Sequence, residues 1–242
     1  MAPILALESI SKRFGAVVVA DGVDLALNEG EALGIIGPNG AGKTTLFGIA
    51  TGTVAPDAGR VVYAGEDITR LPPERRCRKG IARSFQIPQP FSGMTVFENV
   101  VVAAAFGGGA SEASVYEPCA ELLDRCGLAD KANRRAGSLT LLDRKRLELA
   151  RALATKPRIL LLDEVAGGLT EHECAALVAL IKQVRAGGVS IMWIEHVVHA
   201  LIAAVDRLAV LHGGKFIAKG EPHAVIKSPQ VAEIYMGIEA DA

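Results

Sequence analysis

Glycines followed by a lysine and a threonine carry the strongest chemical signal in this sequence. The residues read Gly37-x-x-x-x-Gly42-Lys43-Thr44, and they follow an apolar run that ends at Ile36. Glycines let consecutive backbone N–H groups curve around an anion, and a helix that starts after them adds the positive end of its dipole. A lysine here can bridge the β- and γ-phosphates, and the threonine hydroxyl can bind Mg²⁺. The pattern predicts a nucleoside triphosphate site rather than a simple glycine turn.

An acidic pair offers the second half of this chemistry. Asp163 and Glu164 follow the apolar run Ile159 to Leu162, which predicts a buried strand that ends in two carboxylates. Ligands of α/β proteins bind at the carboxyl edge of the sheet. We expect Asp163 to hold Mg²⁺ through water and Glu164 to polarise an attacking water. By itself, such a pair is equally typical of solvated residues at a strand end, and the glycine-rich loop is what favours the functional interpretation.

His196 ends another predicted strand, over residues 189–194. At that edge its imidazole would contact the γ-phosphate and respond to its loss; the alternative is a surface histidine. His196 and His199 have the spacing of two ligands on one helical face, but no cysteine or third histidine lies near enough to predict a zinc site. The four cysteines form no C-x-x-C pair, so we interpret them as buried or idle thiols.

The elements that must position these residues follow from the apolar pattern. Short β-branched runs separated by Gly and Asp predict a β-rich N-terminal region of about sixty residues. Residues 86–138 are predicted to be largely helical and are interpreted as an inserted subdomain. Helices and strands alternate from residue 139 onward, which is typical of a parallel sheet wrapped by helices. The predicted fold class is α/β.

Composition excludes several classes of protein. The 242 residues include 26 Lys plus Arg and 27 Asp plus Glu, which is not the balance of a polycationic nucleic-acid binder. A basic cluster at Arg75, Arg76, Arg78, Lys79 and Arg83 is predicted to be a solvated face, so no nucleic-acid partner is expected. The longest apolar run has eight residues, far below the roughly 20 of a membrane-spanning helix. With no basic N-terminal leader, the chain is expected in the cytoplasm.

Taken together, the motifs resemble the ATPase subunits of ATP-binding cassette (ABC) transporters along essentially the whole chain. The resemblance rests on the phosphate loop, Phe85-Gln86, Leu139 to Asp143, Ile159 to Glu164 and Glu195-His196. The stretches Ile81 to Gln86 and Met94 to Val100 are most similar to the branch that imports branched-chain and other hydrophobic amino acids. The resemblance implies one ABC-type P-loop NTPase domain, residues 1–242, with an antiparallel β subdomain at its N-terminus. Residues 1–86 and 143–242 would form the ATP-binding core, and residues 87–142 the helical subdomain.

The resemblance also implies a role for each motif. Lys43, Glu164 and His196 would be catalytic, and Thr44, Gln86 and Asp163 would bind Mg²⁺. Gln86 would also link the ATP site to the membrane partner. Phe14 would stack on adenine, although an aromatic residue there is as typical of a core. The other implied ATP contacts are Gly37, Pro38, Asn39, Gly40, Ala41, Gly42, Thr44 and Thr45 and, toward the nucleotide of the opposite subunit, Thr140, Leu141 and Leu142.

The sequence departs from the family where the signature usually reads Leu-Ser-Gly-Gly-Gln. Thr140 keeps a hydroxyl, but Leu142 stands where a glycine normally lets the backbone approach phosphate, and Asp143 replaces the glutamine. Thr170 replaces a usual aspartate and also forms an S/T-x-x-E capping box with Glu173. The resemblance implies ATP and Mg²⁺ as cofactors, a second ATPase subunit, identical or different, and separate permease subunits. The chain would lie on the inner face of the plasma membrane.

Three alternatives stay open at this point. The altered signature is also consistent with a nucleotide-binding scaffold that hydrolyses ATP weakly. A soluble cassette ATPase of translation or repair is disfavoured, because only one phosphate loop and no heptad repeat are present. The ATPase of a lipid exporter is excluded only weakly, since the transported substrate is chosen by proteins other than this chain.

Overall fold

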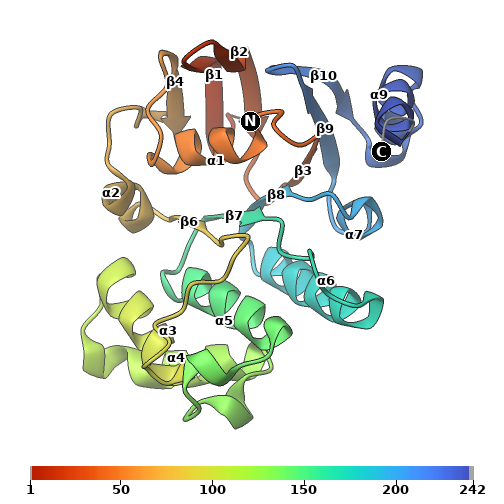
Figure 1. The fold of residues 1–242 in the computed structure, drawn as a ribbon. Helices are drawn as coiled ribbons and strands as arrows, with labels where there is room; N and C mark the ends of the chain where they lie inside the picture. Colours follow the sequence, from red (N-terminus) through yellow and green to blue (C-terminus); the bar gives the residue numbers. More distant parts are fainter. Residues whose placement is uncertain (1, 240–242) are drawn as a thin grey trace. The chain divides into compact units, whose positions relative to one another are not determined.

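The computed structural model describes residues 2–239, and the chain forms two compact units (Figure 1). Unit 1 comprises Met1–Leu71 and Ser190–Ala242, and unit 2 comprises Pro72–Val189. Residues 1 and 240–242, which the predicted single domain includes, lie outside the described residues. The division into a core and a helical subdomain, residues 87–142, stays a prediction.

Unit 1 opens with an antiparallel sheet, in the region that the N-terminal pattern predicts to be β-rich. Its strands run in the order β2-β1-β4-β5, and the β1–β2 pairing sets Leu5 opposite Leu27. Val61 of β4 faces Leu7 of β1, and both side chains are buried. Cross-strand apolar pairs of this kind stabilise the sheet and fix its register. The bounds are β1 Leu5–Phe14, β2 Val17–Leu27, β4 Ala58–Tyr63 and β5 Glu66–Asp67.

The rest of unit 1 is built around β3, Ala32–Ile36, which pairs in parallel with both β8, Ser190–Ile194, and β9, Arg207–His212. Every residue of β3 and β8 is buried, which explains their unbroken apolar sequences. β10, Lys215–Gly220, closes this side as an antiparallel partner of β9. α7 packs on β3, and α8 and α9 pack on β10; Figure 1 shows α9 beside β10. The helices are α1 Lys43–Thr51, α7 Val198–Ile202, α8 Pro222–Ile226 and α9 Pro229–Glu239.

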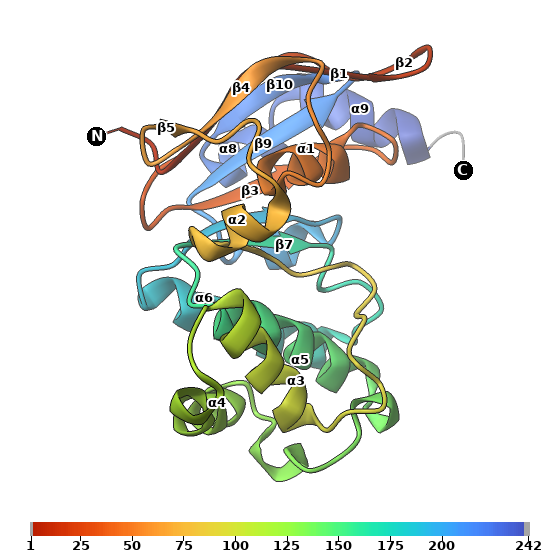
Figure 2. The ribbon, with the colours of Figure 1, turned by 90° about the vertical axis from the view of Figure 1, so that its left-hand side faces the viewer.

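Unit 2 combines one pair of parallel strands with a group of helices. β6, Ile81–Arg83, pairs in parallel with β7, Ile159–Asp163. Figure 2 shows α3, α4 and α5 packed side by side, in agreement with their contacts. The helices are α2 Pro73–Arg78, α3 Val96–Val102, the π-helix Ala103–Gly107, α4 Glu112–Arg125, α5 Leu141–Ala154 and α6 Glu171–Ala186, with 3-10 turns at Ala129–Lys131 and Ala136–Ser138.

The predicted solvated basic cluster is only partly correct. Arg75, Arg78 and Lys79 are exposed, whereas Arg76 is only 1% exposed. Arg83 is also largely covered, with 10% of its side chain exposed. The prediction is wrong for Arg76 because α2 lies against β6 and the π-helix, so one side of α2 faces inward. It is wrong for Arg83 because this residue ends β6 and its guanidinium pairs with the buried Asp163 carboxylate. Among the described residues, no helix is long and apolar enough to cross a bilayer.

The cysteines agree with the prediction of buried or idle thiols. All four are free; Cys119, Cys126 and Cys174 are buried, and Cys77 is partly exposed. Burial raises the pKa of the Cys126 thiol to about 12, because the thiolate form is disfavoured away from water. At neutral pH this cysteine is therefore a poor nucleophile.

The predicted capping box at the start of α6 is present. The Thr170 hydroxyl accepts a hydrogen bond from the Glu173 backbone N–H at 3.3 Å, and the Glu173 carboxylate accepts one from the Thr170 N–H at 2.9 Å. We expect Thr170→Ala to lower the free energy of unfolding by about 1 kcal/mol, since a helix donor loses its partner. Urea unfolding measures this change. Thr170→Ser keeps the capping oxygen and should stay near wild type; equal losses in both variants would contradict the capping role.

Candidate nucleotide-binding site

The phosphate loop, residues 37–45, joins β3 to α1 in unit 1. Gly42 precedes α1 with φ of 99°, and a Cβ there would lie 2.3 Å from the Val19 carbonyl oxygen. At Gly37, a Cβ would lie 2.1 Å from the Leu211 carbonyl oxygen. Glycine is therefore required at both positions on steric grounds. No side chain of the described part of the chain caps α1. A helix N-terminus without a side-chain cap is a favourable position for an anion.

Lys43 is buried within this loop. Its Nζ donates hydrogen bonds to the carbonyl oxygens of Gly37, at 2.7 Å, and of Pro38, at 3.0 Å. These contacts close the loop around the ammonium group and hold a positive charge at the start of α1. The hydroxyl-bearing Thr44 that follows is exposed, and Thr45 is half-buried. The loop therefore presents a cation, a hydroxyl and helix amides together, which is the donor set that a polyphosphate requires.

His196 follows β8 in the same unit as the phosphate loop. Because β3 and β8 are parallel neighbours, their carboxyl ends lie at one edge of the sheet, and the Glu195 N–H donates to the Ile35 carbonyl at 3.4 Å. The buried Glu195 carboxylate accepts the His196 N–H at 3.0 Å and lies 3.5 Å from the His196 Nδ1. The imidazole itself is 58% exposed. Glu195 thus fixes the backbone while the histidine side chain stays accessible.

Phe14 ends β1 and is 52% exposed, so it is not a core residue. The Lys12 ammonium lies 5.3 Å from its ring centroid. Two further apolar residues of the same hairpin, Val17 and Val18, are also exposed. An exposed aromatic ring of this kind is suited to stacking on a planar ligand.

Asp163 ends β7 in unit 2 and has two differently placed carboxylate oxygens. Oδ2 accepts a hydrogen bond from Arg83 Nη2 at 2.5 Å, and the carboxylate side chain is 4% exposed. Oδ1 is buried and has no hydrogen-bond partner within residues 2–239. A buried carboxylate oxygen without a partner is costly unless a ligand supplies one. The open Oδ1 therefore fits a water molecule of a hydrated Mg²⁺.

The small number of carboxylates near Asp163 is also consistent with Mg²⁺ bound together with a nucleotide. Among the described residues, no cluster of three or more His, Cys, Asp or Glu side chains could hold a metal alone. Mg²⁺ in nucleotide sites usually keeps several waters and takes one or two carboxylates together with substrate phosphates. A single carboxylate such as that of Asp163 fits this kind of site, and the described residues contain no dedicated protein cage.

Glu164 is joined directly to Gln86. The Gln86 Nε2 donates to the Glu164 Oε2 at 2.5 Å, although the two residues are far apart in sequence. Glu164 has φ of 48°, a left-handed conformation that costs a non-glycine residue about 1–3 kcal/mol and is common at functional sites. The half-buried carboxylate is therefore held in a specific orientation by its backbone and by the Gln86 amide.

The altered signature forms the N-terminus of α5. The Thr140 hydroxyl accepts the Asp143 N–H at 3.3 Å and so caps the helix. The buried Asp143 carboxylate accepts from Lys131 Nζ at 3.0 Å. Leu141 is exposed, and its Cδ2 would lie 3.3 Å from a Cβ built at Gly168. This helix start already contains its own hydroxyl and its own carboxylate, which lowers its attraction for a further anion.

Two residues of α5, whose role the sequence pattern does not predict, fasten the segment around Gln86. Glu148 of α5 accepts backbone hydrogen bonds from Phe85 and Gln89, and Arg151 donates to the Gln89 carbonyl at 2.9 Å. Burial raises the pKa of the Glu148 carboxyl, and the adjacent Arg151 opposes that shift. The Arg151 guanidinium also stacks on Phe91, with its Cζ 5.2 Å from the ring centroid. The helical period of α5 could not reveal these contacts, because their partners are about sixty residues away.

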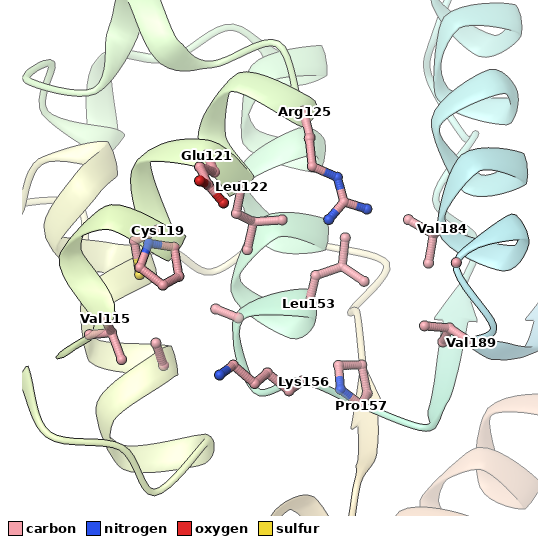
Figure 3. A pocket seen from close by; sticks show the side chains of 14 residues that line it. Val115, Cys119, Glu121, Leu122, Arg125, Leu153, Lys156, Pro157, Val184 and Val189 are labelled. Atoms are coloured by element: carbon pink, nitrogen blue, oxygen red, sulfur yellow. The ribbon is translucent and has the colours of Figure 1, made fainter.

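Unit 2 also contains a pocket of about 400 Å³, partly open to solvent, between α4, the end of α5 and the end of α6 (Figure 3). Val115, Cys119 and Leu122 line one side, and Leu153 and Val184 line another. None of the predicted site residues lines this pocket.

The predicted site residues belong to two groups. Phe14, the phosphate loop and His196 lie in unit 1, and Gln86, Thr140 to Leu142, Asp163 and Glu164 lie in unit 2.

Known proteins match this chain in sequence and in fold along nearly its whole length. The family model described as ABC transporter matches residues 20–167. The high-affinity branched-chain amino acid transport ATP-binding protein BraF of Pseudomonas aeruginosa is 37% identical, over 97% of this chain and 98% of its own. The lipopolysaccharide export system ATP-binding protein LptB of Acidithiobacillus ferridurans is 34% identical, over 98% of both chains. A crystal structure of an ATP-binding cassette of an ABC transporter in its ADP conformation has a TM-score of 0.89 at 33% identity, covering 98% of this chain and 100% of its own.

These similarities confirm the predicted fold class and the predicted binding and hydrolysis of ATP. The chain belongs to the ABC transporter family and is one of its ATP-hydrolysing, ATP-binding cassettes.

Proposed function

We propose that this chain powers a membrane importer for branched-chain or other hydrophobic amino acids. The observation that carries the proposal is the match to an importer subunit along nearly the full length of both chains. The cassette would work on the cytoplasmic face of the membrane, bound to permease subunits. Export of a lipid is the competing function, because an exporter subunit matches over a similar length.

In this proposal, residues of unit 1 bind the nucleotide. Phe14 stacks on the adenine, and the amides of the phosphate loop and of α1 surround the β- and γ-phosphates. The Lys43 ammonium, which contacts the Gly37 and Pro38 carbonyls in this structure, exchanges part of that contact for phosphate oxygens. His196 donates to the γ-phosphate from its position after β8. The loop amides, the Lys43 ammonium and His196 each stabilise negative charge, which is the main requirement of phosphoryl transfer.

Residues of unit 2 activate the water. Glu164 accepts a proton from water while the water oxygen bonds to the γ-phosphorus and the bond to the β–γ bridging oxygen breaks, releasing ADP and phosphate. Asp163, Thr44 and Gln86 would hold Mg²⁺, which supplies charge neutralisation for the phosphates when bound. The contact between Gln86 and Glu164 supports a role for Gln86 in orienting this carboxylate before the nucleotide binds.

A surface for the permease is also part of the proposal. Ile87 and Phe91 are exposed apolar residues in the segment after Gln86, and Phe106 of the π-helix is exposed as well. Exposed apolar residues of this size are typical of protein–protein contacts. Because Glu148 and Arg151 fasten the same segment to α5, a permease that contacts it would act on Gln86 and on the signature helix together.

The dimer partner determines how the altered signature affects turnover. In a head-to-tail dimer, Thr140, Leu141 and Leu142 face the nucleotide held by the other subunit. If the chain pairs with itself, we expect Leu142→Gly to preserve or raise ATP turnover, because glycine allows the backbone closer to phosphate. Steady-state phosphate release from the purified assembly measures this. Leu142→Ala is the matched control, since it removes the side chain without adding backbone freedom; a strong loss of turnover in both variants would mean that the leucine signature is a working variant.

Amino acid uptake tests the import proposal. Cells that lack this gene should take up radiolabelled leucine, isoleucine or valine more slowly, and the wild-type gene should restore uptake while a Glu164→Gln version should not. Normal uptake of all three, together with a defect in lipid export, would replace the import proposal with the export one.

A further inference from the structure

A buried ion pair beside the proposed metal site has no assigned role. Arg83 Nη2 and Asp163 Oδ2 lie 2.5 Å apart, and only 10% of the arginine side chain and 4% of the aspartate side chain are exposed. A buried pair of this kind pays a desolvation cost that its attraction often fails to recover. Its presence at the end of β7 therefore calls for a reason other than stability.

The backbone determines that these two residues meet. Arg83 is the last residue of β6 and pairs with Leu161 of β7, and the Ser84 N–H continues the pairing to the Leu161 carbonyl at 2.9 Å. The guanidinium is also held from a second direction, because its Cζ lies 5.1 Å from the centroid of the Phe85 ring. Arg83 is thus fixed by a strand, a ring and a carboxylate before any ligand binds.

The two oxygens of Asp163 are consequently not equivalent. Arg83 engages Oδ2, whereas Oδ1 is buried and without a partner among the described residues. We propose that Arg83 is a positioning residue for the metal site: it holds Oδ2 so that Oδ1 is the oxygen directed at a water of the nucleotide-bound Mg²⁺. This inference rests on the proposed role of Asp163. It adds a residue that touches neither metal nor nucleotide and acts through the carboxylate.

Metal binding separates this role from a merely structural one. The probe is Mn²⁺, titrated into the protein with saturating ADP and followed by electron paramagnetic resonance. We expect Arg83→Gln to weaken Mn²⁺ binding by about 10-fold or more, since loss of a group that orients a metal ligand typically costs 10–100-fold in affinity. The affinity for ADP without metal should change less than about twofold, because the phosphate loop is untouched.

Three further variants keep the experiment decisive. Arg83→Lys retains the charge but not the planar fork or the stacking, so Mn²⁺ affinity should lie between those of wild type and Arg83→Gln. It also replaces Arg83→Gln if that variant does not fold, which its urea unfolding midpoint would reveal. Arg75→Gln removes an exposed arginine of the same basic stretch and should bind Mn²⁺ as wild type does. Asp163→Asn should lose Mn²⁺ binding more severely than either Arg83 variant.

The outcomes distinguish the inference from the proposed function. Unchanged Mn²⁺ affinity in both Arg83 variants would assign the ion pair to stability alone, and tighter binding would make Arg83 a competitor of the metal; each overturns the inference. If Asp163→Asn also binds Mn²⁺ normally, the proposed metal role of Asp163 fails with it. If Asp163→Asn alone is affected, Asp163 keeps its role and only the positioning by Arg83 is rejected.

Discussion

Replacing Glu164 with glutamine is expected to reduce ATP hydrolysis by at least about 10²-fold, which is the scale of lost general-base assistance, while ATP binding stays unchanged. Glutamine has nearly the same shape, but its amide cannot accept the proton of the attacking water. In the structure, the carboxylate Oε2 accepts from the Gln86 amide at 2.5 Å, and the glutamine oxygen can still fill this position. The loss should therefore fall on the chemical step rather than on local structure.

Single-turnover phosphate release measures that step, and titration with a fluorescent ATP analogue measures binding. The variant should also accumulate as an ATP-bound dimer on size-exclusion chromatography, because the nucleotide that joins the subunits is not consumed. Glu171→Gln changes an exposed carboxylate at the start of α6 and should hydrolyse ATP normally. Near-normal hydrolysis by Glu164→Gln would remove Glu164 from the catalytic role.

Replacing Lys43 with alanine is expected to weaken ATP binding by more than about 2 kcal/mol, or roughly 30-fold, because a charge-assisted contact in a partly desolvated site is lost. The structure adds a second reason. The Lys43 ammonium holds the Gly37 and Pro38 carbonyls, so the loop loses part of its internal support together with the charge. Both effects lower affinity.

Calorimetric titration with ATP gives the affinity, and the urea midpoint shows whether the loop change affects the whole fold. Lys215→Ala is the matched control, since Lys215 is a surface lysine whose partner, Asp21, lies 3.0 Å away and is likewise exposed. If Lys43→Ala binds ATP as tightly as Lys215→Ala, the phosphate loop does not bind the nucleotide in the proposed way.

If this chain pairs with a different cassette, Lys43→Ala also shows which of the two nucleotide sites the altered signature slows. The signature of this chain serves the partner's nucleotide, so the ATP held by Lys43 should turn over normally when the partner has a regular signature. Lys43→Ala should then remove most turnover of the mixed complex, and the equivalent change in the partner should cost less. Equal losses would show that Thr140 to Asp143 works as well as a regular signature.

The sequence by itself determined the elements whose signals are local. The apolar run that ends at Ile36 predicts the end of β3, and the run Ile159 to Leu162 predicts β7 to within one residue. Glycine spacing predicts the phosphate loop, and Thr170 with Glu173 predicts the start of α6. In each case the residues that cause the structure are neighbours in the chain, so their types and spacing contain the information.

Only the tertiary structure decided which distant residues meet. Arg83 reads as part of a solvated basic cluster, yet the β6–β7 register places its guanidinium on Asp163, a contact across 80 positions. Gln86 reaches Glu164 in the same way. These pairs depend on strand register and on the burial of both partners, and neither is encoded in the spacing around one residue. The residue types at these positions are therefore given by the sequence, whereas their partners are a property of the fold.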